Sequence, residues 1–484
     1  MDLDSLIVLA PLIAMTVTAV TLMLAIAIRR NYFLVNGIAG FGIVLSLLLI
    51  GPAWHKSSLQ AIPLLNIDHY ALFFVALLLL AGLAVLGLCH DYFKQREGEN
   101  EELPLLLLTA LLGGSVLAAS SHFAAMFLGL EILSISLFTL IGYPVNRPRP
   151  LEAAIKYLVL SGVSSAFLLM GIALLYAESG ELDFIGIEDF IDAHRPLNFV
   201  MLSGVILIAA GLGFKLSLAP FHLWTPDVYE GSPAPVTAFI ATVSKGAVFV
   251  LLLRLWVTTG SYRYAPLLTV FSFIAMFSIL VGNLQALLQK NIKRLLAYSS
   301  IAHMGYLLVA LIAGASIARP LVIESAAFYL VAYFITTIGA FGVVSVLSTP
   351  QQEAGDVTIL RGLFWRRPWL AGTFTLMLLS LAGIPLTAGF IGKFYVFTSG
   401  ADGRLWSLLA SVIIGSGLGL YYYVRIIVEM SMNSSEEVMS ESTPKSREWL
   451  STVILAALSL LLVWFGILPG HLIDRIQSIA ISMR

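Results

Sequence analysis

Apolar runs of about 20 residues recur along the whole chain and are separated by short polar connections. Each run is long enough for a helix to cross a bilayer core of roughly 30 Å. The pattern predicts an all-α polytopic membrane protein with about 14 transmembrane helices. The predicted spans cover residues 5–28, 32–53, 69–91, 103–119, 121–142, 151–177, 198–219, 235–258, 265–287, 296–314, 320–347, 368–398, 403–429 and 449–469.

The composition agrees with a membrane protein and limits the chemistry of the chain. Of the 484 residues, 59% are hydrophobic and 11% are charged, whereas a soluble domain has roughly 25% charged residues. Cys89 is the single cysteine, which excludes a disulfide framework and a cysteine-held iron–sulfur cluster within this chain. The N-terminal segment begins acidic and ends basic, so we expect a retained first span and not a secretory signal.

The positions of the basic residues predict the orientation. Loops after odd-numbered spans carry fourteen Lys and Arg residues, among them Lys445 and Arg447. Loops after even-numbered spans and the C-terminal tail carry seven, among them Arg195 and Arg484. Because the more basic side faces the cytoplasm, we expect both termini to face the opposite compartment.

Several ionisable residues fall inside the predicted spans, where each one costs at least about 3 kcal/mol. They are Glu131, Lys156, Lys215, Lys245, Arg254, Lys393 and Arg425. Arg254 and Arg425 lie toward the ends of their spans, so we expect them to reach the interface or to brace a neighbouring helix. Glutamates at span edges, Glu152, Glu324 and Glu429, are expected to be solvated.

Three of the lysines lack a carboxylate one helical turn away on the same span: Lys215, Lys245 and Lys393. Desolvation lowers the pKa of a buried lysine by as much as several units. Such a group can gain and lose a proton near neutral pH, which is what a proton relay requires. Glu131 and Lys156 could also belong to this relay, or could form a purely structural ion pair.

Proline and glycine interrupt two spans close to these lysines. Pro220 follows Lys215 by five residues, and the stretch LAGIPLTAGFIGKFYVF leads into Lys393. Interior proline breaks a helix, and non-helical backbone at membrane depth is tolerated only beside protein or a water-filled cavity. We therefore expect discontinuous helices at spans seven and twelve, a pattern typical of transporter sites.

Spans four to eight and nine to thirteen each contain five helices, so the second group would enter the membrane from the opposite face. This predicts two inverted five-helix repeats in which spans seven and twelve correspond. Glu131 then corresponds to His303 and Lys245 to Arg425, whereas Lys156 has no counterpart. The predicted division is an N-terminal three-helix segment (1–102), two repeats (103–258 and 265–430) and a C-terminal helix and tail (448–484).

Five sequence blocks resemble a known family. They are GFKLSLAPFHLWTPDVYEGSPAPVTAF, FLGLEILSISLFTLIGY, EAAIKYLVLSG, NIKRLLAYSSIAHMGYLLVAL and LSLAGIPLTAGFIGKFYVF. Their order and spacing are similar to the antiporter-like membrane subunits of bacterial NADH:quinone oxidoreductase (respiratory complex I, NDH-1), and most of all to the subunit N family. The resemblance covers essentially the whole chain.

The resemblance implies one proton channel. It implies a pair between Glu131 and Lys156, a lysine at each broken span (Lys215 and Lys393) and a further lysine, Lys245, on span eight. It also places His222 between Lys215 and Lys245. A lone histidine near a loop is more often packed or capping, but an imidazole can relay protons near neutral pH. His303, beside Ser299 and Ser300, is a weaker member of the same set.

The resemblance also implies where the redox chemistry resides. The chain contains no dinucleotide fingerprint and no P-loop, so NADH, FMN, the iron–sulfur clusters and quinone are expected in partner subunits. The expected partners are other NDH-1 subunits, especially neighbouring antiporter-like and small membrane subunits, and the lipid bilayer, with no nucleic acid. Two alternatives remain: a subunit of a multi-subunit cation/proton antiporter, and a purely structural membrane subunit.

Overall fold

The computed structural model describes residues 3–56, 62–96, 98, 100–144, 147–194, 198–317, 319–350, 353–432 and 449–482. These residues form helices joined by short connections and contain no β-strand, which confirms the all-α prediction. Arg195, Lys445, Arg447, Arg484 and the predicted boundary at residue 448 lie outside the described residues.

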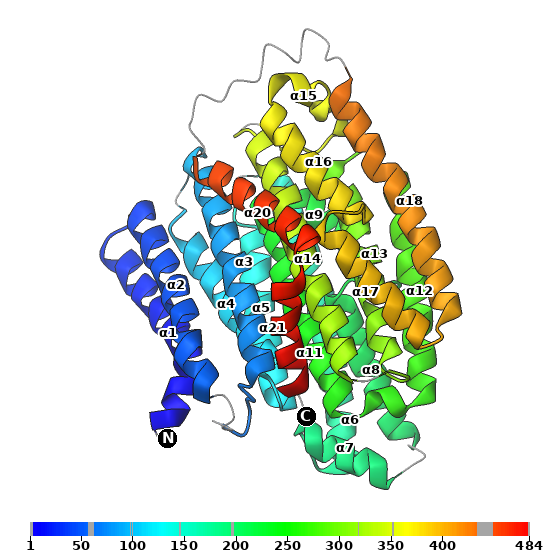
Figure 1. Ribbon diagram of the computed structural model, residues 1–484. Coiled ribbons are helices and arrows are strands. Elements are labelled where there is room, and N and C mark those ends of the chain that lie inside the picture. Colours follow the sequence, from blue (N-terminus) through cyan, green and yellow to red (C-terminus); the bar gives the residue numbers. More distant parts are fainter. Residues whose placement is uncertain are drawn as a thin grey trace.

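The helices follow one another in the order expected from the hydrophobic runs (Figure 1). The N-terminal helices are α1 (Leu3–Ile28), α2 (Tyr32–Lys56) and α3 (His69–Lys94). The next group is α4 (Glu102–Ala119), α5 (Phe123–Ile141), α6 (Pro148–Ser179), α7 (Phe184–Ala193), α8 (Phe199–Lys215), α9 (Trp224–Gly231), α10 (Ala234–Phe239), the π-helical turn η1 (Ile240–Ser244) and α11 (Lys245–Thr258). The third group is η2 (Ser261–Arg263), α12 (Ala265–Leu287), α13 (Ile292–Ala313), α14 (Arg319–Leu347), η3 (Val357–Leu360), α15 (Leu363–Arg366), α16 (Pro368–Ala382), α17 (Ala388–Asp402) and α18 (Trp406–Ser431). The chain ends in α20 (Trp449–Ile467) and α21 (Gly470–Ser482).

Within the described residues, twelve helices or continuous helical stretches are long and apolar enough to cross a membrane. Two shorter apolar helices, α8 and α16, occupy the positions of predicted spans seven and twelve. Both are followed by a break and a second short helix, α9 and α17 respectively. The two interruptions were therefore predicted correctly, while the count of fourteen crossings stays a prediction.

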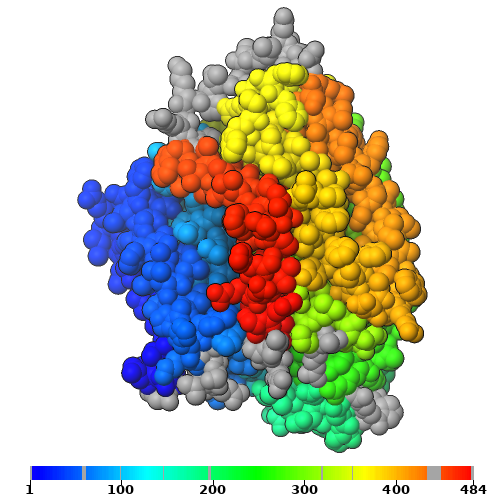
Figure 2. Space-filling view, in the orientation of Figure 1, coloured from blue at the N-terminus to red at the C-terminus, as the bar shows by residue number. Residues whose placement is uncertain are grey.

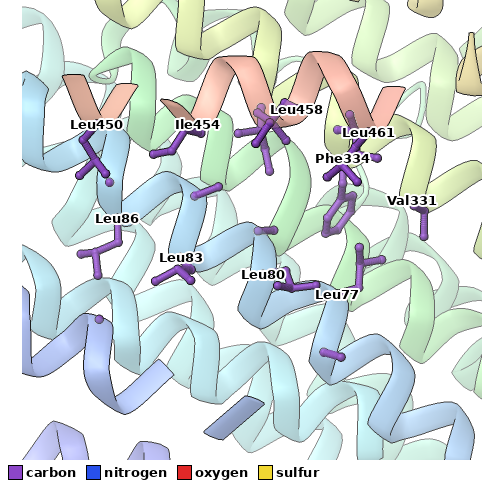
Figure 3. Close-up of a pocket in the computed structure, with 18 of the residues that line it drawn as sticks. Leu77, Leu80, Leu83, Leu86, Val331, Phe334, Leu450, Ile454, Leu458 and Leu461 are labelled. Atoms are coloured by element: carbon purple, nitrogen blue, oxygen red, sulfur yellow. The ribbon is translucent and has the colours of Figure 1, made fainter. Parts of the chain in front are cut away.

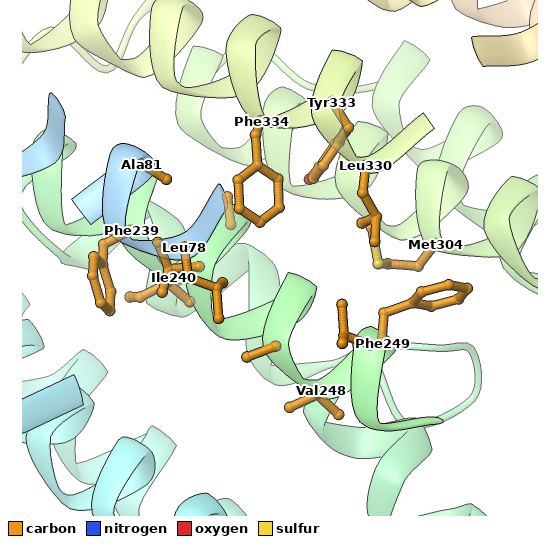
Figure 4. Close-up of a cluster of buried hydrophobic side chains, with 14 of the residues drawn as sticks. Leu78, Ala81, Phe239, Ile240, Val248, Phe249, Met304, Leu330, Tyr333 and Phe334 are labelled. Carbon is orange, nitrogen blue, oxygen red and sulfur yellow. The ribbon is translucent and has the colours of Figure 1, made fainter. Parts of the chain in front are cut away.

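The centre of the molecule is formed by helices that neighbours cover on all sides. The continuous stretch Ala234–Thr258 is buried along its whole apolar window, and α13 and α14 are nearly as well covered. Figure 4 shows side chains from α3, α10, α11, α13 and α14 meeting in one apolar cluster, with Phe249 and Phe334 among them. Polar side chains on these helices therefore face protein and not lipid.

The C-terminal helices α20 and α21 lie at the surface, between the N-terminal helices and the α16–α17 pair (Figure 2). Both chain termini and α7 lie at one end of the molecule, whereas α15 lies at the opposite end (Figure 1). The shared end of the two termini agrees with an even number of crossings.

Candidate functional site

Lys215 is the last residue of α8, directly before the break that leads to α9. Its side chain is 4% exposed, and its Nζ donates hydrogen bonds to Ser134 Oγ (2.6 Å) and Ser161 Oγ (2.7 Å). The C-terminal end of a helix carries a partial negative charge, which favours a cation at this position. The amine is therefore held by neutral hydroxyls and a helix end, without a permanent ion pair among the described residues.

Glu131 lies in the same interface between α5 and α6. Its Oε1 accepts a hydrogen bond from Ser165 Oγ at 2.6 Å. Ser165 follows Ser161 by one helical turn on α6, and Ser134 follows Glu131 by nearly one turn on α5. The carboxylate of Glu131 and the amine of Lys215 thus meet adjacent turns of the same two helices.

Lys156 does not contact Glu131, in contrast to the expected pair. Its side chain is 43% exposed and its Nζ lies 2.8 Å from Glu152 Oε1 and 2.9 Å from Asp227 Oδ2. Nine residues, or two and a half helical turns, separate Lys156 from Ser165, so the two side chains leave opposite faces of α6. Lys156 instead belongs to an exposed ion network, because Asp227 also binds Arg294 at 2.7 Å.

Lys245 begins α11 immediately after the π-helical turn η1, and such turns are frequent at functional sites. Its side chain is fully buried. The Nζ atom donates to Ser300 Oγ at 2.8 Å and lies 5.2 Å from the ring centroid of Tyr229. Lys245 forms no ion pair within the part of the chain that the structure describes, as expected for a relay lysine.

His222 lies in the turn between α8 and α9, and is 8% exposed. Its Nδ1 is buried and has no hydrogen-bond partner among the described residues. The ring centroid lies 6.5 Å from that of Tyr298. A buried polar atom without a partner is unusual, so His222 is poorly explained as a capping residue.

Lys393 lies on α17, just past the second break. Its Nζ donates to the carbonyl of Ala382, the last residue of α16, at 2.9 Å. Gly383 follows with a φ of +85°, and a Cβ there would lie 2.7 Å from Lys393 Cδ. Only glycine fits both the backbone conformation and the lysine stem. Like Lys215, Lys393 therefore sits at the C-terminal end of a half-helix.

His303 connects the Lys245 and Lys393 regions. Its Nδ1 is hydrogen-bonded to the Tyr329 hydroxyl at 2.6 Å. His303, Tyr329, Tyr333 and Lys393 line a small cavity. This cavity leaves about 10 Å³ for water centres, roughly the space of one molecule.

A second cavity of the same size lies next to the first, and Tyr333 lines both. The second cavity also borders Ser300, whose Oγ is 2.7 Å from the Tyr333 hydroxyl. A chain of polar groups therefore runs from Lys245 through Ser300 and Tyr333 to the cavity at Lys393.

Of the hydroxyl groups that contact the lysines or connect them, the sequence drew attention only to Ser300, as a neighbour of His303. The others, which were not identified, are Ser134, Ser161 and Tyr333. Serine and tyrosine are ordinary residues in a membrane helix, and the packing of the helices decides which neighbours their side chains contact. One available signal was the spacing of Ser161 and Ser165, four residues apart on a span that follows the glutamate-bearing one.

Three other predictions about charged residues can be compared with the structure. Arg254 braces a neighbour, as expected: it is 1% exposed and bonds both oxygens of Asp68, at 2.9 and 2.8 Å. The solvated position expected for Glu324 is wrong, because Glu324 is 8% exposed and packed between helices. Arg425 is partly buried and donates to the carbonyl of Leu287 at 3.3 Å, which is the bracing role expected for it.

A cavity of about 870 Å³ lies away from these groups, between α2, α3, α14 and α20. Figure 3 shows leucines of α3, including Leu77 and Leu86, facing Leu450 and Leu458 of α20 across it. Its lining is almost wholly apolar and includes none of the predicted relay residues. Its large size therefore does not make it the site of proton chemistry.

The comparisons with known proteins agree on one family. A family model described as "NADH:quinone oxidoreductase/Mrp antiporter, TM" matches residues 120–419. The chain is 49% identical over 481 residues to NADH-quinone oxidoreductase subunit N of Methylococcus capsulatus, which covers 99% of this chain and 96% of that protein. It is 46% identical over 483 residues to the protein of the same name in Ectopseudomonas mendocina, covering 98% and 97%.

A solved structure is similar over nearly the same length. A chain in respiratory complex I from Thermus thermophilus with bound aureothin is 33% identical, with a TM-score of 0.81. The match covers 96% of this chain and 98% of that one.

Proposed function

The chain belongs to the subunit N branch of the NADH:quinone oxidoreductase/Mrp antiporter family, and on that premise we propose that its buried lysines carry protons across the membrane. Electron transfer from NADH to quinone in partner subunits drives this movement. NADH, FMN, the iron–sulfur clusters and quinone belong to those partners, and this chain is a membrane subunit of the translocating enzyme.

The observation that carries the proposal is a set of lysine amines, on the buried Lys215 and Lys245 and the partly buried Lys393, that only neutral groups hold. Lys215 has two serines, Lys245 has one serine, and Lys393 has a backbone carbonyl. None of these contacts requires the amine to stay charged, because a neutral amine can still hydrogen-bond. An amine clamped by a carboxylate would lose an ion pair on deprotonation, and that is costly in a buried site.

Glu131 supplies the electrostatic control. At about 4 Å and an effective dielectric constant near 20, two unit charges interact by about 4 kcal/mol. A change in the charge or position of Glu131 therefore changes the stability of the ammonium form of Lys215. A neighbouring membrane subunit that acts on Glu131 would load or release the proton of Lys215.

The proton then passes from Lys215 toward Lys245 and on to Lys393. We assign His222 to the first step, because its partnerless Nδ1 lies in the turn that follows Lys215. Ser300, Tyr333 and His303 serve the second step, because they line the small cavities between the two later lysines. Lys156, in its exposed network, is at most an entry-side residue.

We further propose the predicted division into residues 1–102, 103–258, 265–430 and 448–484, with the two middle parts as inverted repeats. The matching breaks after Lys215 and before Lys393 support it. The proposed location is the bacterial inner membrane with both termini in the periplasm. The shared end of the termini and the acidic α7 support this orientation.

The test uses the complete oxidoreductase reconstituted in lipid vesicles. Acidification should require NADH and quinone together, and Lys215→Met should lower the number of protons moved per electron while the complex still assembles. A Na+ gradient that drives proton movement without NADH would favour the antiporter alternative. An unchanged proton-to-electron ratio in Lys215→Met would favour a purely structural subunit.

A further inference from the structure

Glu324 and Asp91, each 8% exposed, are the least exposed carboxylate residues among those that the structure describes. The role of Asp91 is structural, because its Oδ2 accepts from Ser451 N and Ser451 Oγ, both at 2.8 Å, near the start of α20. Glu324 caps no helix end. An ionisable group at membrane depth that no fold feature explains is a candidate for function.

The contacts of Glu324 are with neutral donors from two other helices. Its Oε1 accepts from the hydroxyl of Tyr395 on α17 at 2.9 Å and from Nε2 of Gln477 on α21 at 3.1 Å. Among the described residues it forms no ion pair. A carboxyl group in this setting keeps hydrogen bonds in both its charged and its neutral form.

Glu324 lies between the Lys393 region and the end of the molecule that holds both termini. Glu324 precedes Tyr329, the partner of His303, by five residues on α14, which is about 7.5 Å along the helix axis. Its partner Tyr395 follows Lys393 by two residues on α17. Its other partner, Gln477, lies on α21, which leads to the end of the molecule that holds both termini (Figure 1).

Polar groups occupy the interface between α14 and α17 as well. Ser325 Oγ and Ser399 Oγ are 2.6 Å apart, and both side chains are fully buried. Ser325 lies one turn before Tyr329 on the same face of α14. The described interface from the Lys393 cavity toward Glu324 therefore contains hydroxyl groups and is not sealed by apolar side chains alone.

We infer that Glu324 is the exit carrier of the proton pathway, with Tyr395 as its positioning residue and Gln477 as a contact that only ties α21 to α14. This inference rests on the proposed function of the lysine row. The Lys393 ammonium loses one proton and becomes a neutral amine, and the Glu324 carboxylate takes up one proton and becomes a neutral acid. The acid then releases that proton to water at the end of the molecule that holds both termini. The step moves a proton and transfers no electron.

The test compares Glu324→Gln with Lys393→Met in the complete complex in vesicles. Glutamine keeps the size and the accepting oxygen for Tyr395 but cannot carry the proton. We expect Glu324→Gln to assemble and to slow NADH-driven proton translocation on the order of a hundredfold, the lower end of the scale for losing one acid–base group. Gln477→Leu is the matched control for a purely structural role. It removes the hydrogen bond between α21 and Glu324 but leaves the carboxylate of Glu324 in place.

The outcomes separate the two proposals. A lowered proton-to-electron ratio in both Lys393→Met and Glu324→Gln, with the ratio nearly preserved in Gln477→Leu, supports the exit carrier. Loss in Lys393→Met with a normal ratio in Glu324→Gln overturns the exit carrier and leaves the lysine row intact. A normal ratio in Lys393→Met and Glu324→Gln alike overturns both.

If Glu324→Gln does not assemble, Glu324→Asp takes its place. The shorter side chain keeps a carboxylate but withdraws it from Tyr395 and Gln477. Slowed proton translocation that Tyr395→Phe reproduces in part supports the inference. Wild-type rates and ratios in Glu324→Asp overturn it.

Discussion

Lys393 donates a hydrogen bond to the carbonyl of Ala382 across the break between α16 and α17, at 2.9 Å. The lysine thus occupies the negative end of a half-helix, and Lys215 occupies the corresponding end of α8. The two broken helices present their lysines in the same electrostatic setting. Each ammonium gains a helix end and neutral acceptors without being fixed by a carboxylate.

Lys215→Met and Lys156→Met should differ strongly, although both remove a lysine from the same region. Lys215 is buried on two serines, whereas Lys156 is 43% exposed in an ion network. Exposed ion pairs contribute about 0–1 kcal/mol. We expect proton translocation to fall on the order of a hundredfold in Lys215→Met and to stay within about twofold of wild type in Lys156→Met. Equal losses in both variants would contradict the assignment.

Tyr333→Phe should slow proton translocation without unfolding the protein. The change removes one hydroxyl, which lies 2.7 Å from Ser300 Oγ, and leaves the ring in the core. Tyr70→Phe is the control, because it removes a buried hydroxyl that donates to the carbonyl of Val250 at 2.7 Å and forms no hydrogen bond with the proposed relay residues among those that the structure describes. Each variant should lose about 1 kcal/mol of stability, and only Tyr333→Phe should lower the proton-to-electron ratio in vesicles.

Arg254→Met should destabilise the chain and leave the proton stoichiometry unchanged. Arg254 forms two hydrogen bonds with Asp68, and its guanidinium lies 4.7 Å from the ring centroid of Tyr70. Removing one partner of a buried pair costs about 3–5 kcal/mol. Thermal inactivation of the purified complex measures this loss. The double variant Arg254→Met with Asp68→Leu should recover part of the lost stability. A lowered proton-to-electron ratio in the complexes that still assemble would contradict a purely structural role of Arg254.

The contribution of Glu353 to stability should depend on pH. Burial raises the pKa of Glu353, but the charge of Lys293 and the hydrogen bond from Tyr92 outweigh burial and hold the pKa below its usual range. A carboxyl group with a lowered folded-state pKa stabilises fully at neutral pH, and its contribution is lost as the pH falls through that pKa.

Glu353→Gln should therefore lower the thermal stability of the complex near neutral pH. The difference from wild type should begin to shrink below about pH 4, where the carboxyl of the unfolded chain becomes protonated, and should vanish as the pH falls through the lowered folded-state pKa. Parallel melting curves over the pH range measure this. If the difference in melting temperature grew on acidification, it would contradict the lowered pKa of Glu353.

The sequence was sufficient to predict the long apolar helices and the two breaks, but not the short helices α7 and α21, and the role of the three lysines stays a prediction. Apolar runs of membrane length, prolines and isolated charges are local signals, and each acts through the chain segment that carries it. Lys215, Lys245 and Lys393 were singled out for their apolar surroundings, and in the structure each amine contacts only neutral groups.

Contacts between helices were harder to predict. The expected partner of Glu131 was Lys156, but a nine-residue offset on α6 turns Ser165 toward Glu131 and Lys156 away from it. Glu324 was read as solvated because it lies near a span edge, but α21 returns along α14 and covers it. Asp68, the partner of Arg254, lies in a connection before α3, where nothing in the sequence marks a distant pairing.

The central claim is that the buried lysines carry protons and do not merely hold the helices together. The most direct measurement is the number of protons moved per electron in vesicles that contain the assembled complex with Lys215→Met and Lys393→Met combined. We predict a ratio below that of wild type at matched electron-transfer rates, with each single variant giving the same reduction as the pair because both interrupt one path. A wild-type ratio in the assembled double variant would contradict the claim.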